Sequence, residues 1–227
     1  MKKCATLIFV LFLFNTSSTY SHVQHYKKIK YLKYDLFFND QLIGYHSFIF
    51  FNKDDFLTIE SEGSFKVSKL GINLIKYQTK GRAIYQKNQL IKFSSETIQN
   101  DKKKYVNIDL RENVLKINGS SFNGEIDKKT MISSLWNHEI VTKDKQISSI
   151  SGRINNQKVK FLGKKDIFIG EKQISTLNFH ILSDDDKPPK EKKLNIKIWY
   201  DAKSLLWLKA TYFKMGNWEY RLSEAKF

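Results

Sequence analysis

Cysteine, proline and glycine are all scarce in this sequence. Its 227 residues include 1 cysteine, 2 prolines and 10 glycines. One cysteine excludes a scaffold held together by disulfides, and so little proline and glycine excludes collagen-like and low-complexity chains. The 17 phenylalanines, 11 tyrosines and 4 tryptophans supply enough apolar surface for a real core, which excludes intrinsic disorder.

An apolar run marks the N-terminus. Residues 1–3 carry two lysines, residues 4–14 are apolar almost throughout, and residues 15–21 are mostly small and polar. This is the layout of a secretory signal peptide, and the run is too short to span a bilayer. We predict that residues 1–21 are cleaved and that the protein is periplasmic. The mature chain then lacks cysteine, which suits a bacterial periplasm better than a disulfide-stapled secreted module.

Acidic residues are outnumbered by basic ones, 23 to 39, so the net charge is +16, and it stays at +14 without residues 1–21. This charge favours anionic partners, although lysine on a solvated surface needs no function.

A basic N-terminal arm is predicted at residues 22–33, where lysines alternate with apolar residues. Such an arm suits an anionic membrane surface, or it protects an edge strand from aggregation. Its lysines are Lys27, Lys28, Lys30 and Lys33.

The dominant hydrophobic period beyond the signal is two, with turn residues at short intervals, which predicts a β protein of about ten strands. Met131, Leu135 and Trp136 instead have helical spacing, so we expect one short helix over residues 130–137 with Thr130 as its N-cap. No second domain is visible, so residues 34–227 are taken as a single β domain. The predicted architecture is a strongly curved antiparallel meander, a half-barrel or barrel, wrapped around the short helix.

Several segments also follow a known pattern: residues 34–36, 39–40, 43–46, 133–137, 199–201 and 218–222, together with Tyr77. On these motifs the sequence resembles the bacterial envelope family named domain-of-unknown-function family 6134, and more remotely family 3108. The resemblance runs from Tyr34 to Leu222. It implies a secreted, mostly β protein akin to lipocalin-like or lipoprotein-carrier half-barrels, and it supplies no established activity. Where the family tends to carry an acid and a tryptophan, this chain has residues 81–85 (GRAIY).

Groups that could perform chemistry lack partners at a useful spacing. Ser134 and His138 lie four residues apart, but no glycine elbow flanks the serine and no fixed acid follows. The aspartates at residues 184–186 lack the glycine and the distal glutamate of a calcium loop. We therefore predict no catalytic residue, no metal site and no cofactor.

Aromatic and polar residues of the family-like motifs are the candidate ligand contacts. Trp136 is expected to fill the concave side of the sheet, and large aromatic side chains on the last strands would line a cavity there. Asp201 could simply bond the amides of the turn that follows it. The candidate ligand-binding residues are His46, Tyr77, Trp136, Asn137, Trp199, Tyr200, Asp201, Trp218 and Tyr220.

These features favour a non-enzymatic exported protein that binds a lipid or another apolar or anionic ligand within the sheet. The alternative is an envelope assembly or protein-interaction factor without a ligand cavity, and a hydrolase is the weakest hypothesis. Because the protein is exported, nucleic acid is not an expected partner, and the sequence names no protein partner. The first two hypotheses differ in whether the concave face is open or filled by its own side chains.

Overall fold

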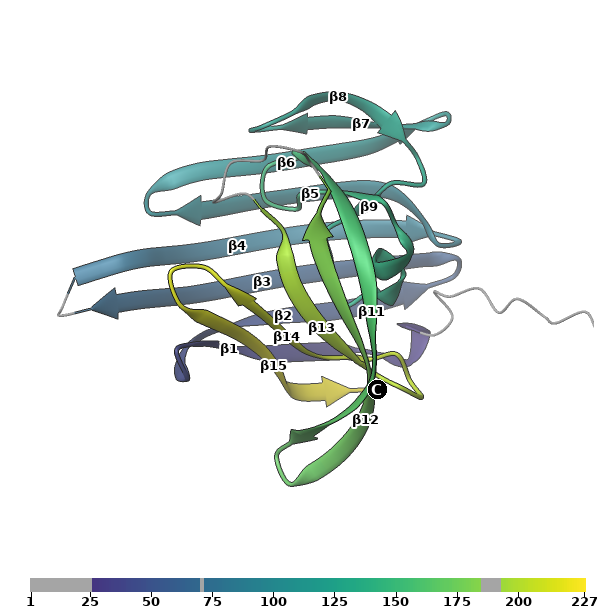
Figure 1. Ribbon diagram of the computed structural model, residues 1–227. Helices are drawn as coiled ribbons and strands as arrows, with labels where there is room; N and C mark the ends of the chain where they lie inside the picture. Colours follow the sequence, from purple (N-terminus) through teal and green to yellow (C-terminus); the bar gives the residue numbers. More distant parts are fainter. Residues whose placement is uncertain (1–25, 70–71, 185–192) are drawn as a thin grey trace, which may run out of the picture.

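The structure, a computed structural model, describes residues 26–69, 72–184 and 193–227. The predicted signal peptide and the first four residues of the predicted arm lie outside these ranges. Most of the described chain is β-strand, and the strands form one large, mainly antiparallel sheet (Figure 1). The elements are β1 (Tyr31–Phe38), β2 (Gln41–Lys53), β3 (Phe56–Lys69), β4 (Ile72–Gln86), β5 (Gln89–Gln99), β6 (Lys102–Arg111), β7 (Val114–Gly119), β8 (Asn123–Asp127), β9 (Met131–Ile132), the 3-10 helix η2 (His138–Thr142), β10 (Lys145–Ile147), β11 (Ile154–Ile169), β12 (Lys172–Ser183), β13 (Asn195–Asp201), β14 (Trp207–Phe213) and β15 (Asn217–Lys226).

The strand order follows the chain in both directions from β1. β1 pairs with β2 on one side and with β15 on the other, so the order is β8 to β1 followed by β15 to β9. All neighbours are antiparallel except β9 and β10, which are parallel. Two-residue turns with positive φ join several hairpins, at residues 39–40, 87–88 and 100–101. Such turns match the right-handed twist of paired strands. With this strand order, the antiparallel meander predicted from the sequence is confirmed.

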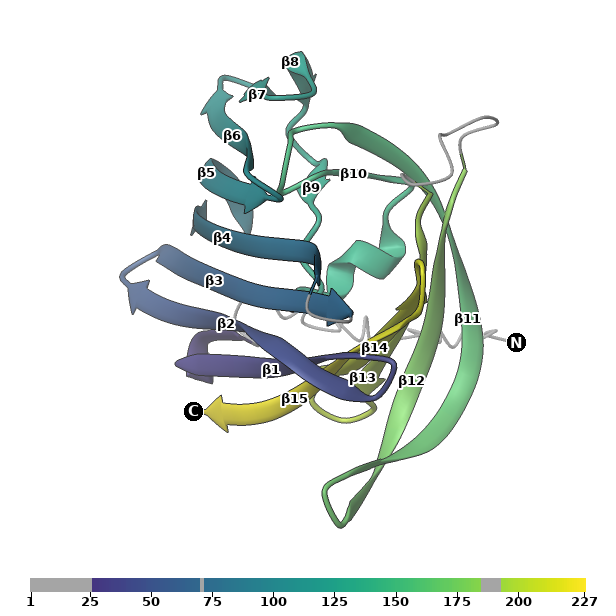
Figure 2. The same cartoon turned by 90° about the vertical axis from the view of Figure 1, so that its left-hand side faces the viewer.

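The sheet curls without closing. In Figure 2 the strands β1–β8 form one wall and β11–β14 the facing wall, and the segment with η2, β9 and β10 lies between them. The outermost strands, β8 and β9, do not pair with each other. Near the gap the Ser121 N–H donates to the Ser151 carbonyl at 2.9 Å. A Cβ on Gly119 would lie 2.6 Å from that oxygen, so a glycine is needed at this approach.

Two details of the predicted fold were wrong. Three short strands, β8, β9 and β10, were missed, because runs of five, two and three residues show no clear period. The helix was expected at residues 130–137, but residues 131–132 form β9 and η2 begins at His138. Its N-cap is Asn137, which accepts from the Glu139 N–H at 3.1 Å. The apolar residues with helical spacing instead belong to an irregular segment, and they pack inside the sheet.

The core lies on the concave side, around Trp136. The Trp136 side chain is 2% exposed and makes edge contacts with Tyr26, Phe50 and Tyr85. Tyr26, Ile29 and Leu32 are buried as well, so residues of the predicted arm belong to this core. None of the helices in the described ranges is long and apolar enough to cross a bilayer.

Candidate functional site

A cavity of about 320 Å³ lies on the concave side of the sheet. Inward-facing residues of β2–β5 form its floor, and β12–β15 form the opposite wall. Residues 132–136 and 146–155 of the interior segment cover one side. The apolar part of the lining includes Phe48, Ile59, Ala83, Phe93, Ile132, Leu135, Trp136, Ile150, Ile181, Leu194, Ile196, Trp207 and Ala210.

Small side chains on adjacent strands create the floor of this cavity. Ser61 on β3 lies opposite Gly81 on β4, which lies opposite Ser95 on β5. Thr79 is the next inward residue of β4, and all four line the cavity. In the neighbouring row of the same strands, Ile59, Ala83 and Phe93 are buried. Space therefore remains where the sequence places serine, glycine and threonine at inward positions.

Trp207 and Tyr34 brace the wall opposite the floor. Their rings stack with centroids 3.9 Å apart, and the Tyr34 hydroxyl donates to the Trp207 carbonyl at 2.9 Å. The indole N–H of Trp207 is buried and has no hydrogen-bond partner among the described residues. A ligand atom that accepts a hydrogen bond could satisfy this donor, because a buried unpaired N–H is unfavourable.

His46 lines the cavity and is surrounded by protein on its other sides. Its ring packs against Phe48 at 4.4 Å and Tyr220 at 6.2 Å between centroids. Burial lowers the pKa of His46 to about 4, because desolvation disfavours the imidazolium. Burial also raises the pKa of Tyr77 and of Tyr220. These cavity groups are therefore uncharged near neutral pH.

Arg153 brings positive charge to the lining, beside a group of hydroxyls. Among the described lining residues it carries the one full charge near neutral pH, and no acidic residue lies with it. Ser133 Oγ donates to Ser149 Oγ at 3.2 Å, and Ser95 Oγ donates to the Ser149 carbonyl at 2.5 Å. The cavity thus combines apolar walls with a few polar groups and one arginine.

Four of the sequence-predicted ligand residues line this cavity: His46, Tyr77, Trp136 and Tyr220. Two others have structural contacts instead. Asn137 caps η2, and the Tyr200 hydroxyl donates to the Leu135 carbonyl at 2.9 Å. Tyr200 therefore holds the interior segment against β13 and does not line the cavity.

The three remaining candidates lie elsewhere. Trp199 is on the other face of β13, where the Lys209 ammonium lies 5.8 Å from its ring centroid. Asp201 accepts from the backbone N–H groups of Lys203 and Ser204. Burial opposes ionisation of Asp201, but the hydrogen bonds from Ser204 and Lys203 outweigh it and lower its pKa. Asp201 therefore bonds the amides of its own turn, which is the alternative that the sequence predicted for this residue.

Trp218 packs at the end of the sheet beyond the cavity. Its ring stacks on Tyr212 with centroids 5.5 Å apart and meets Phe38 edge-on. Its indole N–H donates to the Lys214 carbonyl at 2.9 Å. Because this donor is already bonded, the contacts of Trp218 are those of a core residue.

Sequence reasoning missed Arg153 and the small floor residues. A lone arginine between two strands carries no signal of its own. A signal for the floor does exist, because serine, threonine and glycine recur at alternate positions of three neighbouring strands, in residues 61–63, 79–81 and 95–97. Alternation places such residues on one face of a sheet.

The groups considered for catalysis make separate contacts. His138 Nδ1 lies 2.6 Å from the Tyr26 hydroxyl, which also accepts from the His138 N–H. His46 packs against rings in the cavity, and Asp201 bonds its own turn. No contact described above joins any two of these three residues.

The four predicted surface lysines also occupy different environments. Lys27 and Lys28 are exposed. Lys30 donates to the Phe227 carbonyl at 3.0 Å, and the Lys33 ammonium lies 5.9 Å from the centroid of the Tyr45 ring. Ile29 and Leu32, which lie between these lysines in the sequence, are buried in the core.

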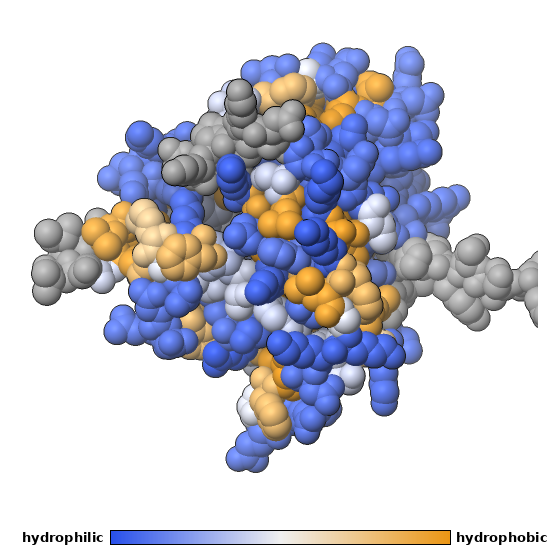
Figure 3. Space-filling view, in the orientation of Figure 1, coloured by the Kyte–Doolittle hydropathy of each residue, from blue (hydrophilic) through white to orange (hydrophobic). Residues whose placement is uncertain are grey.

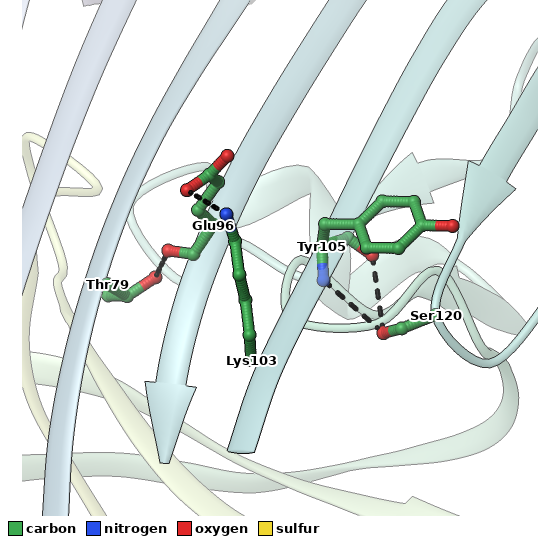
Figure 4. Close-up of polar contacts among 5 residues, drawn as sticks. All are labelled: Thr79, Glu96, Lys103, Tyr105 and Ser120. Atoms are coloured by element: carbon green, nitrogen blue, oxygen red, sulfur yellow. Dashed lines mark hydrogen bonds and ion pairs between the residues drawn. The ribbon is translucent and has the colours of Figure 1, made fainter. Parts of the chain in front are cut away.

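A second, larger hollow of about 1080 Å³ lies on the outer face of β2–β6. Its side chains are mainly polar and charged, and Figure 4 shows contacts along it. Lys103 and Glu96 form an ion pair at 3.1 Å, and the Ser120 hydroxyl donates to the Tyr105 carbonyl at 3.4 Å. Glu60 and Arg82 pair at 3.8 Å. Because these opposite charges are exposed and near one another, the hollow presents a solvated mixed surface.

The comparisons with known proteins agree with this architecture. Residues 34–223 match the family described as "Domain of unknown function (DUF6134)". The chain belongs to this family. The predicted family is therefore confirmed, whereas the remote likeness to family 3108 stays a prediction. No curated protein matches the chain.

A solved structure shares the fold of this family member. It is the crystal structure of a beta-barrel-like protein of domain of unknown function DUF1849 from Brucella abortus. The TM-score is 0.62, with 12% sequence identity over 87% of this chain and 97% of that one. At this identity the likeness concerns the fold alone, and it agrees with the open, barrel-like sheet.

Proposed function

We propose that this protein is an exported, non-enzymatic envelope protein that binds an apolar ligand with an anionic headgroup, such as a fatty acid, in the cavity. The observation that carries the proposal is a cavity with aromatic and aliphatic walls and one charged residue, Arg153, among those that line it. Pockets for small ligands have this character, with mostly apolar walls and a few polar groups that fix orientation.

The volume of the cavity favours a small ligand. The cavity volume of about 320 Å³ lies near the lower end of the roughly 300–1,000 Å³ that is usual for small-molecule pockets. It corresponds to the volume of about ten water molecules. A single short acyl chain suits this space better than a phospholipid with two long chains. Medium-chain molecules are therefore suitable probes.

The charges of the lining favour an anion over a cation. Among the described lining residues there is no carboxylate, and the low pKa of His46 keeps it neutral near pH 7. A ligand carboxylate could accept charge-assisted hydrogen bonds from Arg153, which are stronger than those between neutral groups. The serine hydroxyls beside Arg153 offer further donors.

The alternative is an assembly or interaction factor of the envelope without a ligand cavity. The open space between the floor serines and the Trp207 wall supports ligand binding over that alternative, since a closed core would fill it. A hydrolase gains no support, because His46, His138 and Asp201 make separate contacts.

A direct test is binding of decanoate and decanol to the protein purified after export and without detergent. Native mass spectrometry would detect a one-to-one complex, and fluorescence of Trp136 and Trp207 on the lining would follow the titration. Ser61→Leu fills the floor and should weaken binding of both probes at least about tenfold. The matched control is Ser64→Leu on the outer face of the same strand, which should bind like wild type.

The charged group is tested separately. Arg153→Met should weaken decanoate about tenfold or more, because hydrogen bonds to charged groups contribute roughly 1.5–3 kcal/mol. It should leave decanol unchanged. No complex with either probe, or equal loss in Ser61→Leu and Ser64→Leu, would refute the ligand cavity. A complex insensitive to Arg153→Met would retain the cavity and refute the anionic headgroup.

A further inference from the structure

The hairpin of β11 and β12 extends well beyond the rest of the sheet. β12 pairs with β13 only between Thr176 and Leu182, and β10 pairs with β11 only at residues 154–156. Residues 166–169 and 172–175 therefore pair only with each other in the β11–β12 ladder, and the Ser175 carbonyl also accepts from the Ala202 N–H. Figures 1 and 2 show this green hairpin projecting at the bottom of both views. We call residues 161–175 the hairpin tip.

Large apolar side chains are exposed on the hairpin tip. Phe168 is 67% exposed, Phe161 58% and Leu162 48%. Ile167 lies opposite Ile174 on the other face of the ribbon from Phe168. In Figure 3 hydrophobic side chains lie among hydrophilic ones on this projection. Phe161 lies at the base of the hairpin, where its ring contacts Phe179 at 5.1 Å between centroids. Phe168, Ile167 and Ile174 lie on the two-stranded part, which has no core to bury them, so apolar groups on both of its faces indicate a partner.

Exposed lysines surround these apolar residues. Lys164, Lys165 and Lys172 lie on the hairpin tip, and Lys160 directly precedes it. The tip also carries Asp166, whose carboxylate accepts from Gln173, and Glu171. Basic side chains outnumber acidic ones, as they do in the whole chain with its net charge of +16. The tip thus combines exposed phenylalanine and half-buried isoleucine with three lysines and two acidic residues, and Lys160 adds a further positive charge at its base.

The hairpin also departs from a regular ladder. A register shift between Phe161 and Gly163 marks a bulge at its base. Bulges bend a strand and increase its local twist. A Cβ at Gly163 would have no neighbour within 4 Å, so no other element packs against the bulge there. The ladder is therefore irregular at the point where the tip leaves the sheet.

We propose that the hairpin tip docks on the surface of a membrane that contains anionic phospholipids. Phe161, Phe168 and the isoleucines would enter the boundary between headgroups and acyl chains, about 5–10 Å deep. The lysines would remain at headgroup level and contact the phosphates, because their long stems follow the apolar surface while the ammonium stays hydrated. This surface is distinct from the cavity and from the lysines of the predicted N-terminal arm.

The test is flotation of the mature protein with two kinds of vesicle. One is phosphatidylcholine alone, and the other contains equal parts of phosphatidylcholine and phosphatidylglycerol. Wild type should bind the mixed vesicles at least about tenfold better, and salt should reduce this binding. Phe161→Ser/Phe168→Ser should reduce the partition coefficient at least about tenfold, as expected for two phenylalanines withheld from the membrane. Lys164→Gln/Lys165→Gln should reduce binding to the mixed vesicles only.

Two controls locate the contact. Phe213→Ser/Met215→Ser changes equally exposed residues, 70% and 69%, at the other end of the sheet, and should bind like wild type. Replacing the four arm lysines by glutamine should retain the sensitivity to the hairpin variants. If the serine variant does not fold, Phe168→Trp supplies a second readout, because its fluorescence should be quenched by brominated lipid.

Several results would overturn the proposal. They are absence of binding to mixed vesicles, equal binding by Phe161→Ser/Phe168→Ser, loss of binding in the Phe213 control, and no quenching in Phe168→Trp. A lipid-free dimer that dissociates in the serine variant would instead assign the tip to contact between copies of the chain. Binding of decanoate in the cavity is independent of all these outcomes.

Discussion

The two faces of β3–β5 are built from the same strands and have opposite chemistry. On the inner face, serine, threonine, glycine and aromatic residues surround a cavity whose titratable groups are mostly uncharged. On the outer face, alternate residues of these strands form ion pairs, Glu60 with Arg82 and Glu96 with Lys103 of the neighbouring β6. Buried contacts depend on shape and desolvation, whereas exposed ion pairs are weakened by water and salt. Changes on the inner face should therefore have larger effects on stability than changes on the outer face.

The largest effect is expected at the centre of the inner face. Trp136→Ala should lower the free energy of unfolding by about 3–5 kcal/mol, because it removes a buried indole and leaves a cavity among Tyr26, Phe50 and Tyr85. Tyr105→Ala on the outer face should cost less than about 1 kcal/mol. Denaturant unfolding of both variants measures the difference. Equal losses would mean that the two faces do not differ in packing.

A pH dependence should come from His46. Its folded pKa of about 4 is below the ordinary value of 6.5, so the unfolded chain binds the proton more readily. The stability from a neutral His46 is complete above pH 6.5. It falls as the pH drops from 6.5 to about 4, by about 3 kcal/mol in all.

Unfolding of His46→Gln at several pH values tests this. His46→Gln should lose the fall in unfolding free energy that His46 causes between pH 6.5 and about 4. The control is His180→Gln, at an exposed position where the ring bonds Asn195, and this variant should keep that fall. An unchanged pH profile in His46→Gln would show that the imidazole is well solvated in the folded protein.

A smaller effect is expected from one hydrogen bond of the inner wall. Tyr34→Phe removes the donor to the Trp207 carbonyl and should destabilise the protein by about 1–2 kcal/mol, because a buried acceptor is left unpaired. Tyr105→Phe, whose hydroxyl makes a long exposed contact of 3.4 Å with Asn118, is the control and should change little. Thermal unfolding of both variants compares a buried with an exposed phenol.

The smallest effect is expected for an outer ion pair. A double-mutant cycle of Lys103→Met and Glu96→Gln should give a coupling of about 0–1 kcal/mol, and added salt should reduce it. A coupling above about 2 kcal/mol would contradict the description of the outer face as a solvated surface. The cycle is read by denaturant unfolding at low and high salt.

Much of the sheet could be predicted because its long hairpins repeat one signal. Alternating strands end at Asn39–Asp40, Lys87–Asn88 and Asn100–Asp101, where two adjacent residues adopt positive φ. The segment around Trp136 could not be predicted in this way. Its apolar residues have helical spacing, but they pack in an irregular chain inside the sheet, so the contacts of the interior decided its shape.

The sequence predicted four residues of the candidate site, His46, Tyr77, Trp136 and Tyr220, but not which aromatic residues of β13 reach it. In β13, Ile198, Trp199 and Tyr200 are all buried, and a register shift separates Trp199 from Tyr200. Periodicity therefore could not tell which of these side chains faces inward. Arg153 lies in the connection between the neighbouring strands β10 and β11, and no local pattern marks it as a cavity residue.

By itself the sequence determined the β architecture, the positions of the hairpins and the family, because alternation and turn chemistry act over a few residues. The tertiary structure alone decided that the strands curl around an interior segment, that small residues of β3–β5 leave a cavity, and that Phe161 and Phe168 stand outside the core. Those features depend on which distant strands meet, and on how much volume their side chains fill, which no short-range pattern contains.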